Sequence, residues 1–174
     1  MTERTPNAAH ATRRDAAWWR GRRGEWYVVG QFVLFALVAA GPATWHGWPP
    51  WRFPGGQPAG VAGVAMMAAG LALALWGGLT QGAALQALPY PRDDGRLIRN
   101  GPYRFVRHPI YSGALLAAFG WAIWRQGWLT LMYAALLFLL FDAKARREEE
   151  WLQEKFPAYG EYRRRVRKFV PFLY

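Results

Sequence analysis

The densest set of chemical groups in the chain is the stretch GPYRFVRHPIYSG at residues 101–113. His108 followed by Pro109 predicts the start of a helix, because proline is well suited to the first helical position. The backbone N–H groups that such a start leaves free, together with the helix dipole, form an anion site. Arg104 and Arg107 would reinforce it, so we expect this stretch to hold a carboxylate.

Other groups in the same stretch, and one run further along, suit a positive charge. Aromatic ring faces attract cations, and Tyr103 and Tyr111 could each present one. Glu148 could bind an ammonium group or ribose hydroxyls, and Glu149 and Glu150 extend this acidic run. A ligand with a carboxylate, an ammonium, a second cation and an aromatic base would meet all of these groups. S-adenosylmethionine has all four features.

Each of these residues also has an ordinary structural interpretation. Arginines beside a membrane helix commonly anchor it at the lipid surface, and tyrosines gather at the same level. A histidine before a helical proline often caps the helix, and a glutamate run after an apolar helix is often only solvated. The residue types alone therefore leave a ligand site and a set of interfacial anchors both open.

The elements that must position these residues are four long apolar segments. Each of the first two reaches about 30 Å as a helix, the thickness of a bilayer core. The last two are shorter, and only residues 125–127 separate them, so we expect a tight antiparallel hairpin. The predicted fold is an all-α integral membrane protein with about four transmembrane helices, at Trp26–Trp45, Ala59–Leu79, Pro109–Trp124 and Trp128–Ala143.

The charge distribution favours a membrane over nucleic acid as the partner. The net charge is +11, and lysines and arginines concentrate in the first 25 residues (6), the 80–108 loop (5) and the tail after Asp142 (9). The two loops between them carry one each, Arg52 and Arg125. Because basic segments stay in the cytoplasm, we expect both termini to be cytoplasmic, in the inner or cell membrane. The absence of cysteine excludes disulfides, thiolate catalysis and Cys-ligated metals.

The chain is expected to form a single membrane domain, 1–174, with five parts. A basic tail precedes two membrane helices, a polar loop, the hairpin and C-terminal helices that face the loop. Their expected bounds are 1–25, 26–79, 80–108, 109–143 and 144–174.

Two of these parts carry a further pattern. In the last part, apolar and aromatic residues recur at three- or four-residue steps, which indicates one face of an amphipathic helix: Trp151, Leu152, Phe156, Tyr159, Tyr162 and Val166. Pro157 is expected to break this helix in two. The second apolar segment is rich in glycine and alanine, which predicts close helix packing or a dimer face.

The spacing of two motifs is more specific than the residue types. The first is Gly101-Pro102-Tyr103 followed by Arg107-His108-Pro109-x-Tyr111-x-Gly113. The second is Glu148-Glu149-x-x-Leu152 followed by Phe156, Tyr159, Tyr162, Val166 and Pro171. Together they resemble the paired motifs of the isoprenylcysteine carboxyl methyltransferase and phospholipid methyltransferase superfamily, over about residues 97–171.

The resemblance implies an integral-membrane methyltransferase that uses S-adenosylmethionine and has no Rossmann domain. Its cofactor would lie on the cytoplasmic side, between the hairpin and the C-terminal helices. The matching positions imply a set of cofactor-binding residues: Leu97, Ile98, Tyr103, Arg107, His108, Pro109, Ile110, Tyr111 and Glu148. Lys144 would lie near the acceptor, where members commonly have arginine, and Gly95 stands where a histidine is common.

Methyl transfer from a sulfonium is an in-line displacement that needs no metal, so the protein must mainly align donor and acceptor. The expected acceptor is lipophilic: a prenylcysteine-like carboxylate, or a lipid amine, thiol or acid. His108 and Glu149 are the candidate catalytic residues, because an amine or thiol acceptor would have to lose a proton. The identity of the acceptor and the oligomeric state stay open.

Two other functions are compatible with the sequence. Membrane sterol reductases share a related signature of Arg, His, Pro and Tyr, which would imply NADPH as the cofactor, although they typically have more than four spans. A non-catalytic lipid-binding membrane protein would use basic tails to hold anionic lipid. The short chain and the pair Glu148-Glu149 favour methyl transfer over the reductase.

Overall fold

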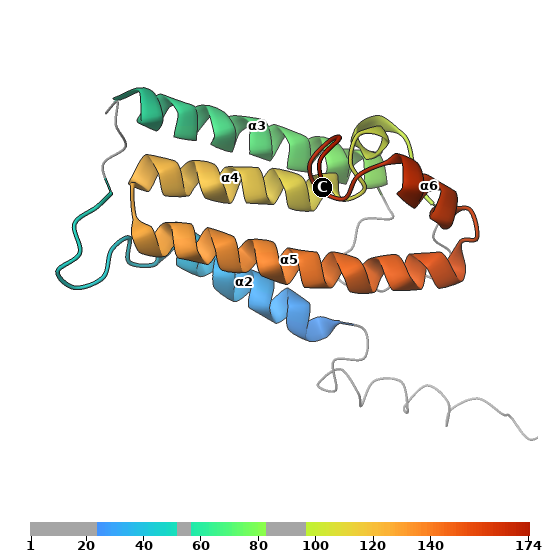
Figure 1. Cartoon of the computed structure of the whole chain (residues 1–174), viewed down its shortest axis with the longest axis horizontal. Coiled ribbons are helices and arrows are strands. Elements are labelled where there is room, and N and C mark those ends of the chain that lie inside the picture. The colour runs from blue at the N-terminus through green and yellow to red at the C-terminus, as the bar shows by residue number, and fades with distance from the viewer. Residues whose placement is uncertain (1–23, 52–56, 83–96) are drawn as a thin grey trace, which may run out of the picture.

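Six helical elements follow one another in the described part of the chain, residues 24–51, 57–82 and 97–174 of a computed structural model (Figure 1). Over these residues there is no β-strand, and a single parallel bridge pairs Val106 with Arg167. The predicted all-helical class is therefore confirmed. The elements are α2 (Glu25–Ala40), α3 (Gln57–Gln81), the short 3-10 helix η3 (Gly101–Arg104), α4 (Pro109–Arg125), α5 (Trp128–Lys155) and α6 (Tyr159–Arg165).

Two of the described helices are long and apolar enough to cross a membrane, judged by length and composition. They are Ala59–Gln81 within α3 and Trp128–Lys155, which is the whole of α5. The helix α2 is a shorter apolar helix. The count of four spans stays a prediction.

The helix α2 ends earlier than the sequence pattern predicts. We expected a helix to Trp45, but α2 stops at Ala40. The reason is local, because Gly41 is extended, with φ −67° and ψ 162°, and the proline that follows restricts the residue before it to extended conformations. The N–H of Gly41 closes the helix by donating to the carbonyl of Leu37 at 2.9 Å.

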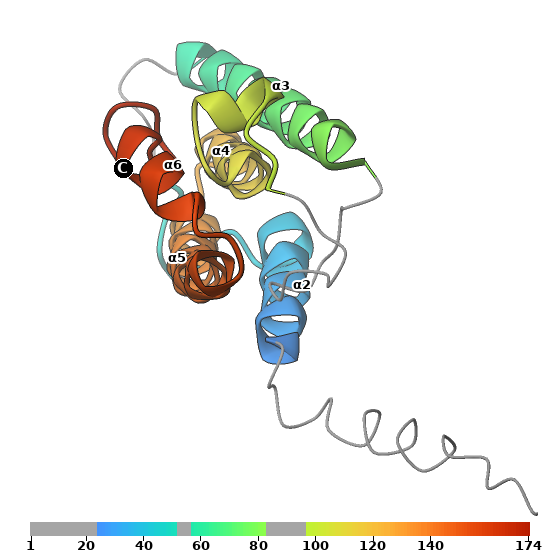
Figure 2. The same ribbon diagram turned by 90° about the vertical axis from the view of Figure 1, so that its right-hand side faces the viewer.

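Glycines hold α3 and α4 at very short range, and Figures 1 and 2 show the two helices side by side. A Cβ on Gly70 would lie 2.5 Å from the carbonyl oxygen of Gly113, and a Cβ on Gly63 would lie 2.7 Å from that of Gly120. The close packing predicted from the small residues of this segment is confirmed. The motif glycine Gly113 therefore serves helix contact.

The predicted hairpin is also confirmed, but its second helix is longer than we expected. The helix α4 ends at Arg125 and α5 begins at Trp128, with Gln126 in the left-handed conformation at φ 52°. Instead of ending near Ala143, α5 continues to Lys155 as one helix of 28 residues. Residues 144–155 contain strong helix formers and no glycine or proline, so nothing interrupts the helix.

The helix break predicted at Pro157 is confirmed, because α5 ends at Lys155 and α6 begins at Tyr159. The last residues of the chain return to the start of α4. Beyond α6, the carbonyls of Arg167 and Lys168 accept hydrogen bonds from the N–H groups of Arg107 (2.8 Å) and His108 (3.1 Å). The hydroxyl of Ser112 donates to the carbonyl of Phe169 at 2.8 Å. Figure 2 shows α6 and the C-terminus gathered over α4 and α5. This return brings the two sequence motifs together.

Candidate functional site

The site is built where α4 begins, and the backbone before α4 is shaped by Gly101. This glycine has φ 57°, and a Cβ there would also lie 2.9 Å from the hydroxyl oxygen of Thr80. Only glycine fits both the left-handed conformation and this close approach. The chain then turns through η3, which places Arg107 and His108 directly before the first turn of α4.

His108 occupies the position before the helix, but its side chain does not cap it. Instead its ring lies between two glutamates of α5. Its Nε2 donates to Oε1 of Glu149 at 3.0 Å, and its Nδ1 lies 3.7 Å from Oε2 of Glu148. The capping interpretation is wrong, because the side chain makes no hydrogen bond to the helix. The ring is 5% exposed and contacts the acidic run instead.

Glu149 joins three cationic or donor groups from different elements. Its Oε1 accepts from Nε of Arg107 at 2.9 Å as well as from His108, and its Oε2 lies 3.4 Å from Nε of Arg163. The side chain of Glu149 is 2% exposed and that of Arg107 is 8% exposed. Arg107 also donates from Nη1 to the carbonyls of Arg163, at 3.2 Å, and Val166. This buried ion pair ties α4, α5 and α6 together.

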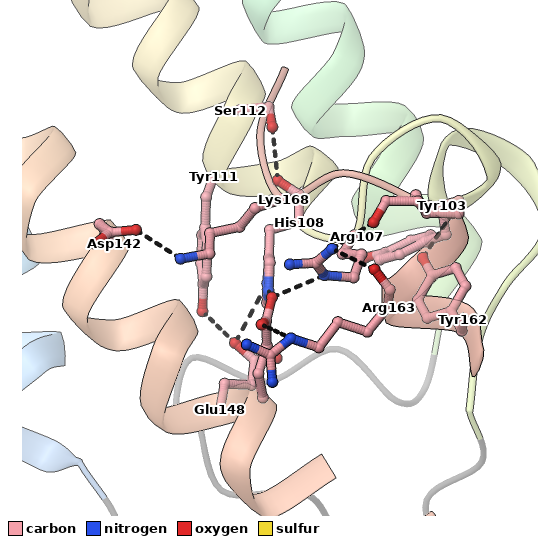
Figure 3. Close-up of polar contacts among 12 residues, drawn as sticks. Tyr103, Arg107, His108, Tyr111, Ser112, Asp142, Glu148, Tyr162, Arg163 and Lys168 are labelled. Carbon is pink, nitrogen blue, oxygen red and sulfur yellow. Dashed lines mark hydrogen bonds and ion pairs between the residues drawn. The ribbon is translucent and has the colours of Figure 1, made fainter. Parts of the chain in front are cut away.

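Glu148 is placed differently from its neighbour. Its Oε2 accepts a hydrogen bond from the hydroxyl of Tyr111 at 3.0 Å (Figure 3). Its side chain is 22% exposed. Its Oε1 accepts no hydrogen bond from any residue in the described ranges. A partly open carboxylate with one oxygen still able to accept is suited to a ligand's ammonium or hydroxyl groups.

A stack of aromatic rings fixes the orientation of Tyr111 and His108. The two rings are parallel within 5°, with centroids 5.3 Å apart, and Tyr111 also stacks on Phe141 at 4.7 Å. Phe169, from the returning C-terminal segment, meets the edge of the stack at 5.9 Å from His108. The stacking therefore holds the polar atoms of both rings toward Glu148 and Glu149.

Lys144 of α5 lies between the site and α2. It is 1% exposed, its Nζ donates to Oε1 of Gln31 at 2.7 Å, and it lies 5.1 Å from the ring centroid of Tyr111. Sequence reasoning placed Lys144 near the acceptor but missed Gln31. The signal was present, because Gln31 is the one side-chain amide within α2.

The remaining predicted residues lie beside the cluster. Tyr103 is buried, and its carbonyl accepts from the hydroxyl of Tyr162 at 2.6 Å. Burial raises the pKa of both tyrosines above the ordinary value, so both hydroxyls stay protonated. Pro109 and Ile110 pack against Gly77 of α3. Within the described residues, none of Tyr103, Pro109 and Ile110 makes a hydrogen bond or ion pair with Glu148 or Glu149.

Three sequence predictions concern residues outside this cluster. Leu97 and Ile98 are half-buried in the segment just before η3. Arg104 does not join the expected anion site, because it is exposed and lines a separate cleft of about 310 Å³ with Arg99 and Arg165. Gly95 lies outside the described residues.

Sequence reasoning also missed how the C-terminal segment is fastened. Asp142 of α5 accepts from Nζ of Lys168 and from the hydroxyl of Tyr174, both at 2.7 Å, and from Nε of Arg146, also at 2.7 Å. Figure 3 shows Lys168 reaching Asp142 beside Tyr111. No local pattern in the sequence marks this contact between residues 26 positions apart.

Comparison with known proteins identifies the family. Residues 59–159, which include α4 and both glutamates, match the family described as phospholipid methyltransferase, and the chain belongs to this family. The first motif and the acidic pair, whose contacts define the site, therefore fall within the family's own region.

Three relatives show where the similarity extends. The chain is 33% identical over 155 residues to the cobalt-zinc-cadmium resistance protein CzcN of Cupriavidus metallidurans, covering 88% of this chain and 65% of the relative. It is 30% identical to the nickel-cobalt-cadmium resistance protein NccN of Alcaligenes xylosoxydans xylosoxydans, covering 88% and 66%. A probable protein-S-isoprenylcysteine O-methyltransferase of Oryza sativa subsp. indica is 34% identical over 87 residues, covering 47% and 44%. The chain thus spans just under two thirds of the two bacterial relatives.

Proposed function

We propose that the protein transfers a methyl group from S-adenosylmethionine to a lipophilic acceptor at the cytoplasmic face of a membrane. The observation that carries this proposal is the hydrogen bond between Tyr111 and Glu148, which joins the two motifs across 37 residues of sequence. Family membership supports methyl transfer, and the apolar helices α3 and α5 support a membrane setting.

The groups present fit the cofactor. The open oxygen of Glu148 suits the cofactor's ammonium or its ribose hydroxyls, and the hydroxyl of Tyr111 holds that carboxylate in place. A contact of the cofactor's carboxylate with the first turn of α4 stays a prediction, because the C-terminal segment covers this turn and Arg107 is paired with Glu149. When bound, S-adenosylmethionine supplies a methyl group already activated by its positive sulfur.

The protein's own contribution would be alignment and exclusion of water. The ring stack of His108, Tyr111 and Phe141 closes one wall, and the C-terminal segment covers the start of α4. Positioning of this kind can lower a barrier by about 7–11 kcal/mol in favourable cases. Glu149 holds Arg107 and His108 in position, and catalytic roles for His108 and Glu149 stay predictions.

The central experiment combines calorimetry with S-adenosylhomocysteine and transfer of a labelled methyl group to a panel of lipid and prenyl-thioether acceptors. We expect Glu148→Gln to abolish cofactor binding and transfer while the protein stays folded in detergent. Glu150→Gln is the matched control, because that carboxylate is 58% exposed and pairs with Arg147 on the surface. Unchanged binding in Glu148→Gln would refute this site.

The same protein preparation separates the rival functions. A methyltransferase should gain thermal stability from S-adenosylhomocysteine and not from NADPH, and a reductase should show the reverse. A non-catalytic lipid-binding protein should respond to neither, and its lipid binding should fall steeply with salt.

The bacterial relatives indicate a physiological setting. Because two metal-resistance proteins match 88% of the chain, we propose that its methyl transfer contributes to resistance to divalent metals such as cobalt and cadmium. A deletion strain should grow less well in these metals, and the wild-type gene but not the Glu148→Gln gene should restore growth. Equal rescue by both genes would separate metal resistance from methyl transfer.

A further inference from the structure

A basic cleft with a volume of about 310 Å³ lies between the segment that carries η3 and the helix α6. Figures 1 and 2 show these two segments side by side, although they are far apart in the sequence. The hydroxyl of Tyr162 donates to the carbonyl of Tyr103 at 2.6 Å, which fixes one segment against the other. We call this feature the arginine cleft, and its lining residues are Arg99, Arg104, Glu161, Tyr162, Arg165 and Val166.

The arginine cleft has an excess of positive charge. Three arginines line it against one glutamate, so its lining residues carry a net charge of +2. Nη2 of Arg165 pairs with Oε1 of Glu161 at 2.6 Å, which neutralises that arginine. The side chains of Arg99 and Arg104 make no hydrogen bond or ion pair with any residue that the structure describes. Two guanidinium groups thus share one cleft without a counter-charge, and their fields add there.

The arginine cleft is separate from the proposed cofactor site. That site centres on Glu148 and Tyr111, and neither residue lines the cleft. Arg107, three residues after Arg104, is instead held by Glu149 at 2.9 Å. The proposed methyl transfer therefore gives no role to Arg99 or Arg104.

The cleft lies near the end of an apolar helix. A Cβ on Gly101, which falls between the two unpaired arginines in the sequence, would lie 2.9 Å from the hydroxyl oxygen of Thr80 at the end of α3. The helix α3 is one of the two described helices that are long and apolar enough to cross a membrane. Leu79 in its last turn is 71% exposed, and Phe105 beside η3 is 54% exposed. Basic side chains beside the end of such a helix are expected at the level of the phospholipid headgroups.

We propose that the arginine cleft binds a phosphate group, and that this phosphate belongs to an anionic membrane phospholipid. Guanidinium groups are planar, and their paired N–H donors match the oxygens of a phosphate. A volume of about 310 Å³ is at the lower end of the range for ligand pockets, which suits a headgroup phosphate with part of its glycerol. Leu79 and Phe105 offer the acyl chains an apolar surface beside it. The phospholipid is here a bound ligand and not the methyl acceptor, so the inference does not depend on methyl transfer.

The test uses the full chain in a non-ionic detergent without phosphate, and it measures binding by calorimetry and thermal stability. The three probes are phosphatidylglycerol in mixed micelles, soluble glycerol 3-phosphate, and a diacylglycerol with the same acyl chains and no phosphate. Phosphatidylglycerol should bind at least about tenfold more tightly than glycerol 3-phosphate, because its acyl chains add apolar contact. Equal affinity for these two probes would support the phosphate site with a soluble phosphate as its ligand. Failure of both to bind, or equal binding of the diacylglycerol, would overturn the inference.

Removing either unpaired arginine should weaken this binding. Arg99→Gln and Arg104→Gln should each lower the affinity for phosphatidylglycerol about tenfold, because each removes a charge-assisted contact with the phosphate. Arg164→Gln is the matched control, since it removes the same charge from an exposed residue of α6 that does not line the cleft. An equal loss in the control would assign the binding to the basic surface as a whole and reject a site in the cleft.

Glu161 provides a test in the opposite direction. Glu161→Gln releases Arg165 from its ion pair, so affinity for phosphatidylglycerol should rise about three- to tenfold. Glu150→Gln is the matched control, because it makes the same change in net charge and releases Arg147 from a surface pair at 2.7 Å outside the cleft. An equal gain in both variants would show that net charge alone governs binding. Displacement of the lipid by S-adenosylhomocysteine would assign the cleft to the cofactor, and it would equally overturn the inference.

Discussion

His108 and Glu149 lie 41 residues apart in the chain, yet their side chains meet at 3.0 Å between Nε2 and Oε1 inside the protein. The two side chains are 5% and 2% exposed. Arg107 donates to the same carboxylate oxygen at 2.9 Å. One carboxylate of α5 therefore holds the start of α4 and balances the charge of a buried guanidinium.

Replacing Glu149 should lower the free energy of unfolding more than replacing one partner of a surface ion pair would. Glu149→Gln leaves the guanidinium of Arg107, 8% exposed, without a counter-charge. Removing one partner of a buried ion pair typically costs about 3–5 kcal/mol, so the free energy of unfolding should fall by about that amount. Thermal or chemical unfolding in detergent would measure it. Glu148→Gln is the comparison, and an equal loss in both variants would contradict separate roles for the two glutamates.

The hydroxyl of Tyr111 should matter for the cofactor more than for stability. Tyr111→Phe keeps the ring stack with His108 and Phe141 but removes the 3.0 Å hydrogen bond to Glu148. Without this hydrogen bond the carboxylate of Glu148 is no longer held in one orientation, so affinity for S-adenosylhomocysteine should fall about tenfold, which corresponds to about 1.4 kcal/mol of lost preorganisation. Calorimetry would measure the affinity. Tyr133→Phe, at a buried tyrosine away from the cluster, should leave it unchanged.

The C-terminal segment should loosen when its contact with Asp142 is removed. Lys168→Met keeps an apolar side chain of similar length but removes the 2.7 Å ion pair, whose two side chains are each 12% exposed. The N–H groups of Arg107 and His108, which donate to this segment, should then exchange with deuterium faster. Arg146→Met removes another partner of Asp142, but that arginine is 67% exposed, so exchange should change little. Equal effects would show that the segment is held by other contacts.

Residues with strong local signals could be placed from the sequence. Pro109 starts α4 and Pro157 separates α5 from α6, because proline restricts the backbone wherever it occurs. Gln126 and Gly127 form the hairpin connection as expected from the length of the gap. The resemblance placed His108 and Glu148 at one cofactor site but predicted no direct contact between them, and no local rule brings such distant residues together.

Three other features were not predicted, and only the contact between Lys168 and Asp142 depends on a long-range return of the chain. The continuity of α5 past Ala143 was missed because a change from apolar to charged composition looks like the end of a segment, although helix propensity does not change. The contact between Lys168 and Asp142 depends on how the C-terminal segment returns, which no residue pattern records. Gln31 was overlooked as one polar residue in an apolar run, although its type alone was a signal.

The close contact of α3 with α4 should tolerate no added methyl group at Gly70. A Cβ there would lie 2.5 Å from the carbonyl oxygen of Gly113 and 2.6 Å from the backbone nitrogen of Ala117, and backbone atoms cannot turn aside as a side chain can. Gly70→Ala should therefore lower the free energy of unfolding by about 1–3 kcal/mol, the usual cost of overpacking. Gly60→Ala, on the same helix, would meet nothing within 4 Å and should stabilise by up to about 1 kcal/mol, because alanine favours helix over glycine. Thermal unfolding of both variants tests the contact, and a Gly70→Ala protein as stable as Gly60→Ala would show that α3 and α4 are not packed this closely.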